Sequence, residues 1–94
     1  MKIIEIITST CSICKMIKPM ITKVIGDSGI DFEVYTADIP EEAANVQDLL
    51  DDYSIKSVPA FFFMKNDKII GTHFGAITMP QLKKNIEDLK NYEC

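Results

Sequence analysis

Residues 2–25 read KIIEIITSTCSICKMIKPMITKVI, in which a strand pattern gives way to a helix pattern. The run from Lys2 to Thr8 is rich in β-branched residues and apolar on both faces except at Glu5, which predicts a central strand. After a short polar turn, apolar residues recur at the spacing of one helix face from Ile13 to Ile25. Two cysteines therefore fall where a strand ends and a helix begins.

The remainder of the chain continues to alternate strands and helices. The patterns predict a strand at 31–37, an amphipathic helix at 41–53, a hairpin of strands at 60–65 and 68–74, and a last helix that opens with a capping box at Thr78 and Gln81. Strand–helix–strand units imply parallel pairing by right-handed crossover, and a hairpin adds antiparallel strands. We expect one α/β domain over residues 1–94, with a four-stranded mixed sheet, helices on both faces and the order β-α-β-α-β-β-α.

Composition and charge exclude several classes of protein. The 94 residues are 47% hydrophobic and carry a net charge of −4 without a basic run, so we expect no nucleic-acid partner. The apolar stretches are too short to cross a bilayer, and the N-terminus lacks the pattern of a signal peptide. We therefore expect a cytoplasmic monomer with no membrane partner.

The chain has three cysteines, whereas a secreted disulfide scaffold would carry an even number. A single Cys-x-x-Cys motif, here Cys11 and Cys14, indicates either a redox pair or half of a zinc site. A closed zinc site needs four ligands, and only His73, in a predicted strand, and Cys94, at the chain end, remain. The redox interpretation is favoured, no metal is expected, and Cys94 is interpreted as a free terminal thiol.

The position of Cys11 indicates a nucleophile. The first turn of a helix presents unpaired N–H groups and the positive end of its dipole, which stabilise a thiolate and lower a cysteine pKa from about 8.5 to about 3.5–7.5. The thiolate is the species that attacks disulfides. Cys14 lies almost one turn further on, close enough to form a reversible disulfide with Cys11 after a small adjustment.

Two further residues support thiol–disulfide chemistry. The Val58–Pro59 bond can be cis at small cost, and a cis bond would leave the Val58 backbone facing the cysteines, ready to pair with a substrate strand. A trans proline at the start of a strand is the alternative. Burial of Glu5 would raise its pKa and let it accept the proton of Cys14; the alternative is a partly exposed strand carboxylate.

The sequence also predicts which apolar residues lie on the surface and which lie in the core. We expect Ile13, Val58 and Ala76 to form an exposed apolar patch around the sulfurs, as docking sites for proteins do. Methionines are adaptable core residues, and we expect Met16 to be buried with Met20 and Met64.

Taken together, these segments resemble the thioredoxin family through nearly the whole chain, without that family's first strand and helix. The matching segments are Cys11-Ser12-Ile13-Cys14 with its continuation to Pro19, Ser57-Val58-Pro59-Ala60 at the cis-proline, Lys65-Asn66-Asp67 at the hairpin turn, Phe74-Gly75-Ala76 at the glycine loop, and Glu5 at the buried acid. The resemblance implies a thioredoxin-like fold trimmed to the size of a glutaredoxin.

The resemblance also implies a function. The chain would be a protein thiol–disulfide oxidoreductase that reduces protein disulfides, with Cys11 as nucleophile, Cys14 as resolving cysteine and Glu5 assisting proton transfer. The substrate groove would be formed by Ile13, Val58, Pro59, Gly75 and Ala76. Electrons would come from NADPH through a thioredoxin reductase-like flavoprotein, with no cofactor bound to this chain.

Two alternatives remain open at this point. The short chain favours a glutaredoxin-like reductase that depends on glutathione, although the strand at 60–63 and the turn after it lack the glycines and polar groups that those proteins use for glutathione. The other alternative is a thioredoxin-fold binding module in which the cysteines are incidental.

Overall fold

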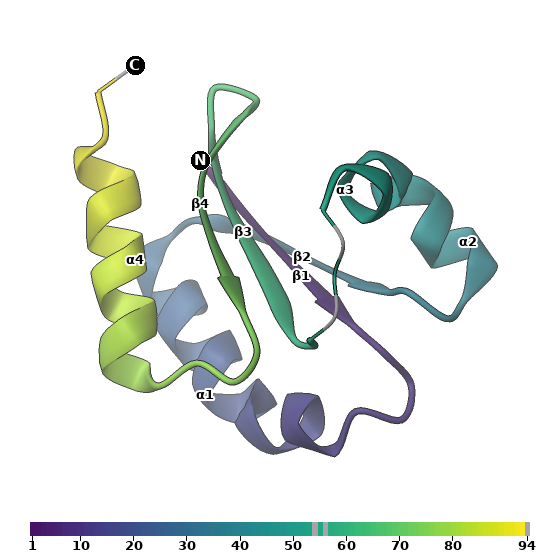
Figure 1. The fold of residues 1–94 in the computed structure, drawn as a ribbon. Coiled ribbons are helices and arrows are strands. Elements are labelled where there is room, and N and C mark those ends of the chain that lie inside the picture. The colour runs from purple at the N-terminus through teal and green to yellow at the C-terminus, as the bar shows by residue number, and fades with distance from the viewer. Residues whose placement is uncertain (54, 56, 94) are drawn as a thin grey trace.

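The computed structural model describes residues 1–53, 55 and 57–93, so Cys94, interpreted above as a free thiol, lies outside the described residues. A four-stranded sheet with the strand order β2-β1-β3-β4 occupies the centre (Figure 1). The elements are β1 (Lys2–Ile7), α1 (Ser12–Ser28), β2 (Asp31–Thr36), α2 (Pro40–Ala43), the 3₁₀ helix η1 (Ala44–Val46), α3 (Gln47–Asp52), β3 (Ala60–Lys65), β4 (Lys68–Phe74) and α4 (Met79–Asn91).

Strand β1 is central, parallel to β2 and antiparallel to β3, and β4 pairs antiparallel with β3. Both predictions for the sheet, the central strand and the mixed pairing, are confirmed. The central position follows from the apolar character of both faces of β1, since both are covered.

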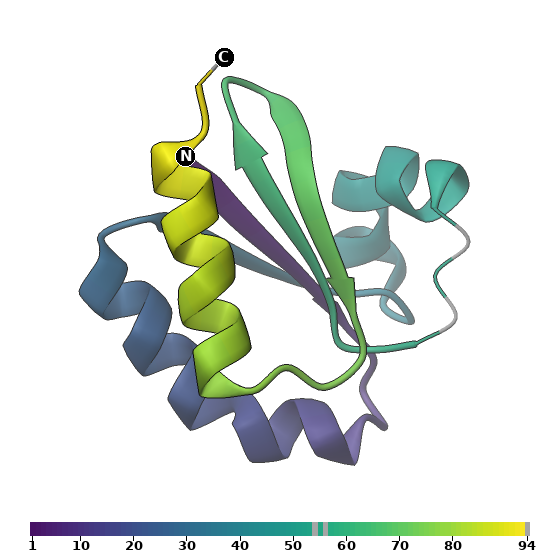
Figure 2. The same cartoon turned by 60° about the vertical axis from the view of Figure 1, so that its left-hand side comes forward.

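Helices cover the two faces of the sheet unequally. Helices α1 and α4 lie on one face, and the short segments α2, η1 and α3 lie on the other (Figures 1 and 2). Alternate residues of the strands point to opposite cores: Ile3 and Phe61 join the core beneath α1 and α4, whereas Ile4 and Phe62 join the core beneath α3. The predicted arrangement, with helices on both faces, is confirmed.

The prediction of one continuous helix over residues 41–53 was wrong. The chain forms α2, η1 and α3 in succession, and the backbone leaves helical geometry at Val46, whose φ and ψ are −126° and 23°. The side chain of Val46 is buried against Ile4 and Phe62. Valine is a weak helix former, so burial of this side chain in the sheet's core outweighs the continuity of the helix.

Helix α1 begins directly after Cys11 and continues through Pro19 to Ser28. Gly29 ends it with a φ of 74°, a left-handed conformation that glycine adopts without strain. The prediction that Met16 is buried was wrong, because its side chain is 69% exposed. Cys14, Ile21 and the other buried residues of α1 lie on the opposite side of the helix.

Local signals set the other turns and caps. The hairpin of β3 and β4 turns at Asn66 and Asp67, whose φ angles of 53° and 63° suit a tight primed turn. At the start of α4, the Thr78 side chain accepts from Gln81 N at 3.2 Å, and the Gln81 side chain accepts from Thr78 N at 2.9 Å. The predicted capping box is confirmed.

The strand pairing also defines one edge of the sheet. Ile6 near the end of β1 pairs with Ala60 at the start of β3, which pairs with Phe74 at the end of β4. The segments that leave or enter these strands, among them the turn before α1, therefore meet at the same edge. This edge is opposite the β3–β4 hairpin in Figure 1.

Candidate active site

Cys11 is the N-cap residue of α1. Its backbone is extended, with φ and ψ of −80° and 99°, and its N–H donates to Thr8 O at 3.2 Å. Cys11 Sγ accepts a hydrogen bond from Cys14 N at 3.1 Å. The sulfur therefore occupies the position where an unpaired amide at the helix start stabilises negative charge.

Cys11 and Cys14 form a disulfide, as the sequence predicted. Their Cα atoms are 5.3 Å apart, inside the usual range of about 4.4–6.8 Å for a disulfide. Both side chains are buried, with Cys11 at 9% exposure and Cys14 at 5%.

Pro59 and Gly75 lie at the sheet edge where α1 begins. The Val58–Pro59 peptide bond is cis, as the sequence predicted, and Gly75 N donates to Pro59 O at 2.8 Å. This bond continues the β3–β4 pairing by one residue beyond Ala60 and Phe74. Gly75 has a φ of 95°, in the region that favours glycine.

The residues expected in an apolar patch differ in exposure. Ile13 and Ala76 are exposed, Val58 is half-buried and Pro59 is buried. Phe74, which belongs to the predicted glycine-loop segment but was not assigned to the patch, is an exposed aromatic side chain that ends β4 directly before Gly75. An aromatic residue next to the glycine loop was the signal that could have identified it.

Glu5 is only 5% exposed and has the same parity along β1 as Ile3, so it faces α1 and α4. Burial raises the pKa of Glu5 to about 7, and the positive charge of Lys18 partly opposes this rise. Lys18 lies four residues after Cys14 and thus on the same side of α1. Glu5 therefore lies on the face of the sheet that α1 covers, with a pKa suited to taking up and releasing a proton at neutral pH.

Two side chains that the sequence analysis missed hold the turn before Cys11. Asp38 accepts hydrogen bonds from Ser9 N at 3.0 Å and from the Ser9 hydroxyl. These bonds lower the pKa of Asp38. They join the β1–α1 turn to a segment 29 residues away, and a contact at that separation leaves no local pattern in the sequence.

His73, predicted on the surface of a strand, is half-buried, and its Nε2 lies 2.9 Å from Ala76 O. A carbonyl only accepts, so Nε2 donates and holds the Gly75–Ala76 loop. Within residues 1–53, 55 and 57–93, no three His, Cys, Asp or Glu side chains gather as a metal site requires. In the same part of the chain, no helix has the length and apolar character needed to span a bilayer.

Comparisons with known proteins agree with this geometry. Residues 1–88 match the model of the thioredoxin family. A thioredoxin-like protein from Synechocystis sp. is 30% identical over 81 residues, which cover 85% of this chain and 70% of that protein.

Solved structures show the same fold. Mitochondrial thioredoxin 3 from Saccharomyces cerevisiae, in its oxidised form, has a TM-score of 0.74 and 26% identity, covering 93% of this chain and 76% of that one. Thioredoxin 1 from Thermosipho africanus has a TM-score of 0.76 and covers 98% of this chain and 100% of its own, and at 22% identity it supports the fold alone. The chain therefore belongs to the thioredoxin family, and the Cys11–Cys14 disulfide at the start of α1 makes it a thiol–disulfide oxidoreductase.

Proposed function

We propose that this protein reduces disulfide bonds of other proteins and is itself oxidised to the Cys11–Cys14 disulfide. The observation that carries the proposal is the hydrogen bond of 3.1 Å from Cys14 N to Cys11 Sγ at the N-cap of α1. The same amide is placed to stabilise the Cys11 thiolate once the disulfide is reduced.

The reaction begins with attack by the Cys11 thiolate on one sulfur of a substrate disulfide. A new S–S bond joins Cys11 to the substrate, the substrate's own S–S bond breaks, and its second sulfur leaves as a thiolate that takes a proton from water. The product of this step is a mixed disulfide between the two proteins.

Cys14 then resolves the mixed disulfide. Its thiol loses a proton to the Glu5 carboxylate, and the resulting thiolate attacks Cys11 Sγ. The Cys11–Cys14 bond forms as the bond to the substrate breaks, so two electrons in total pass to the substrate. A buried carboxyl with a pKa of about 7 is half-ionised at neutral pH and can accept this proton and later release it.

Substrate docking is assigned to the sheet edge around the disulfide. Val58, next to the cis bond, offers backbone groups to an extended substrate segment, as in strand addition. Ile13 and Ala76 are exposed and contribute apolar contact on either side, with Gly75 and buried Pro59 shaping the floor between them.

Each turnover leaves the protein oxidised, so an external reductant must restore the dithiol. We assign this role to a thioredoxin reductase-like flavoprotein that draws electrons from NADPH, with no cofactor held by this chain. The cycle belongs in a reducing compartment, which we take to be the cytoplasm. We also propose that the protein acts as a monomer, because a single chain contains every residue that we assign to its two reaction steps.

The test is reduction of insulin by dithiothreitol-recycled protein, in a Cys94→Ser background that leaves only the two motif cysteines. We expect Cys11→Ser to abolish turnover, and we expect Cys14→Ser, reduced first and then freed of dithiothreitol, to accumulate mixed disulfides with the substrate. A Ser12→Ala variant, changed between the cysteines but keeping both, should remain active and serves as the matched control.

Retained activity in Cys11→Ser would contradict the assigned nucleophile. The electron donor is tested by coupling the cycle either to a flavoprotein thioredoxin reductase with NADPH or to glutathione with glutathione reductase. Turnover with glutathione alone would show that the donor, and the class of reductase, had been assigned incorrectly.

A further inference from the structure

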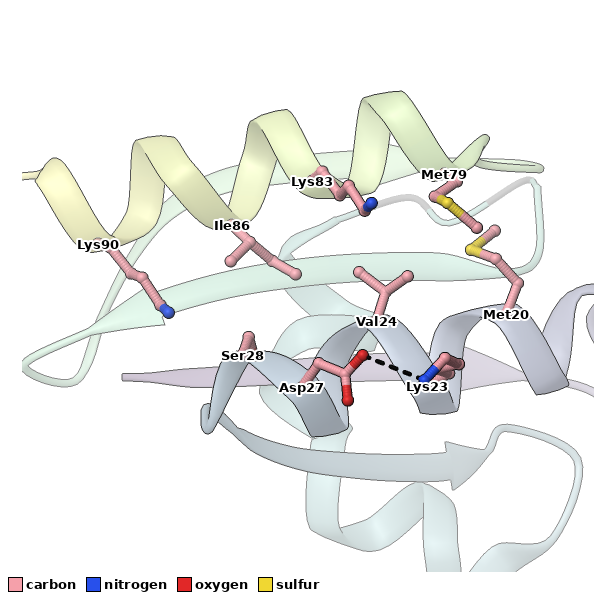
Figure 3. A pocket seen from close by; sticks show the side chains of 9 residues that line it. All are labelled: Met20, Lys23, Val24, Asp27, Ser28, Met79, Lys83, Ile86 and Lys90. Atoms are coloured by element: carbon pink, nitrogen blue, oxygen red, sulfur yellow. Dashed lines mark hydrogen bonds and ion pairs between the residues drawn. The ribbon is translucent and has the colours of Figure 1, made fainter.

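A groove with a volume of about 390 Å³ runs between α1 and α4, on the solvent side of the core that these helices share (Figure 3). Its apolar lining comes from Met20 and Val24 of α1 and from Met79 and Ile86 of α4. In Figure 3 the thioethers of Met20 and Met79 point toward one another, and Ile86 points toward Val24. The redox mechanism uses none of these residues.

The dimensions of the groove suit a narrow apolar ligand. Its volume lies within the range of about 300–1,000 Å³ that is typical of small-molecule sites. The α1 wall extends from Met20 to Ser28, about 12 Å along the helix, so the mean cross-section is about 30 Å². This width admits an alkyl chain. Methionine side chains can adapt to such a chain.

The charge along the groove is opposite in sign to that of the whole protein. Lys23, Lys83 and Lys90 line it together with Asp27, so its local charge is +2 in a chain whose net charge is −4. Asp27 pairs with Lys23 at 3.4 Å. Lys83 and Lys90, on either side of Ile86 along α4, supply the excess positive charge.

We propose that this groove binds a single-chain carboxylate amphiphile, that is, a molecule of the fatty-acid class. The alkyl chain lies on the floor between Val24 and Ile86, where burial of its methylenes favours binding. The carboxylate remains at the rim, at one end of the groove, where either Lys83 or Lys90 supplies an ammonium group. The proposal is independent of the redox function, since it uses neither cysteine.

The probe is sodium decanoate below its micellar concentration, observed through the ε-methyl NMR signals of the five methionines. We expect saturable shifts for Met20 and Met79, which line the groove, and an unchanged signal for Met64, which lies in β3. Decyltrimethylammonium has the same chain length with the opposite charge and should bind at least several-fold more weakly.

Variants test separately how the lysine charges and the apolar floor of the groove contribute to decanoate binding. Lys83→Gln with Lys90→Gln should weaken decanoate binding about two- to fivefold, as expected for loss of one exposed ion pair whichever lysine forms it. Lys15→Gln with Lys68→Gln, which changes the net charge equally outside the groove, is the control. Met79→Glu should abolish binding and Met79→Leu should preserve it; glutamate is tolerated at this position because it begins α4.

Equal binding of decanoate and decyltrimethylammonium would overturn the proposal, as would shifts of Met64 equal to those of Met20. Sedimentation that showed the groove covered by a second copy of the chain would also overturn it. Cys11→Ser should bind decanoate as the unchanged protein does. The decanoate-binding result therefore does not depend on whether the proposed redox cycle is correct.

Discussion

Glu5→Gln should remove a pH dependence of stability that comes from one buried carboxyl. The folded protein raises the pKa of Glu5 from 4.5 to about 7 by burial. Between these two values the folded chain binds more protons at this group than the unfolded chain does. The free energy of unfolding must therefore fall as the pH rises through this window.

The size of the fall follows from the two pKa values. The interval from 4.5 to about 7 corresponds to about 3 kcal/mol, complete by about pH 8 and absent below about pH 4. This is a large share of the roughly 5–15 kcal/mol that stabilises a typical domain. Glutamine keeps the shape of the side chain and does not titrate, so the variant should lack the fall.

The assay is urea unfolding of the disulfide-bonded protein at a series of pH values from about 4.5 to about 8. The free energies of unfolding of the unchanged protein and of Glu5→Gln are compared at each pH. The other titratable groups are the same in both proteins, so their contributions cancel in the difference between the two free energies of unfolding. The difference in stability should move by about 3 kcal/mol in favour of Glu5→Gln as the pH rises. Parallel curves for the two proteins would refute the reasoning.

Two further variants show whether the effect belongs to Glu5. Hydrogen bonds from Tyr35 and Lys2 lower the pKa of Glu33, so its stabilising effect is lost only as the pH falls below the usual carboxyl range. Glu33→Gln should therefore give a difference that is flat from about pH 5 to pH 8. Lys18→Gln removes a charge that lowers the pKa of Glu5, so the fall should extend to higher pH.

Four other results are expected. Glu5→Gln should slow the attack of Cys14 on a preformed mixed disulfide, measured by stopped flow; rates that match the unchanged protein at every pH would remove Glu5 from the mechanism. Thr78→Ala should lower the free energy of unfolding by about 1 kcal/mol because the capping box is lost, and Thr78→Ser is the near-neutral control. Leu82→Ala should lower it by about 2–5 kcal/mol because Leu82 is fully buried. Urea unfolding measures both changes. Asp38→Ala should speed hydrogen exchange at the amide of Ser9, and unchanged exchange would show that this bond does not hold the turn.

Signals between near neighbours in the chain were sufficient for much of the fold. The apolar run of β1, the Asn66-Asp67 turn and the Thr78–Gln81 capping box each depend on residues within one turn or one strand, and each was predicted. The placement of Cys11 at the start of α1 followed in the same way, because the change from strand period to helix period is visible in the sequence.

Features that depend on distant parts of the chain were not predictable in this way. The helix over 41–53 breaks at Val46 because that side chain is buried against strands far away in sequence. Met16 is exposed because the position of α1 on the sheet leaves that side of the helix uncovered. Asp38 reaches Ser9 only after β1 and β2 have paired.

The same division applies to the site. The sequence by itself determined which residues carry the chemistry, since the spacing of Cys11 and Cys14 at a strand–helix junction is a local property of the chain. The tertiary structure alone decided the protonation of Glu5 and the groove between α1 and α4. The pKa of a carboxyl depends on how much water the folded chain excludes, and a groove exists only once two helices have packed side by side.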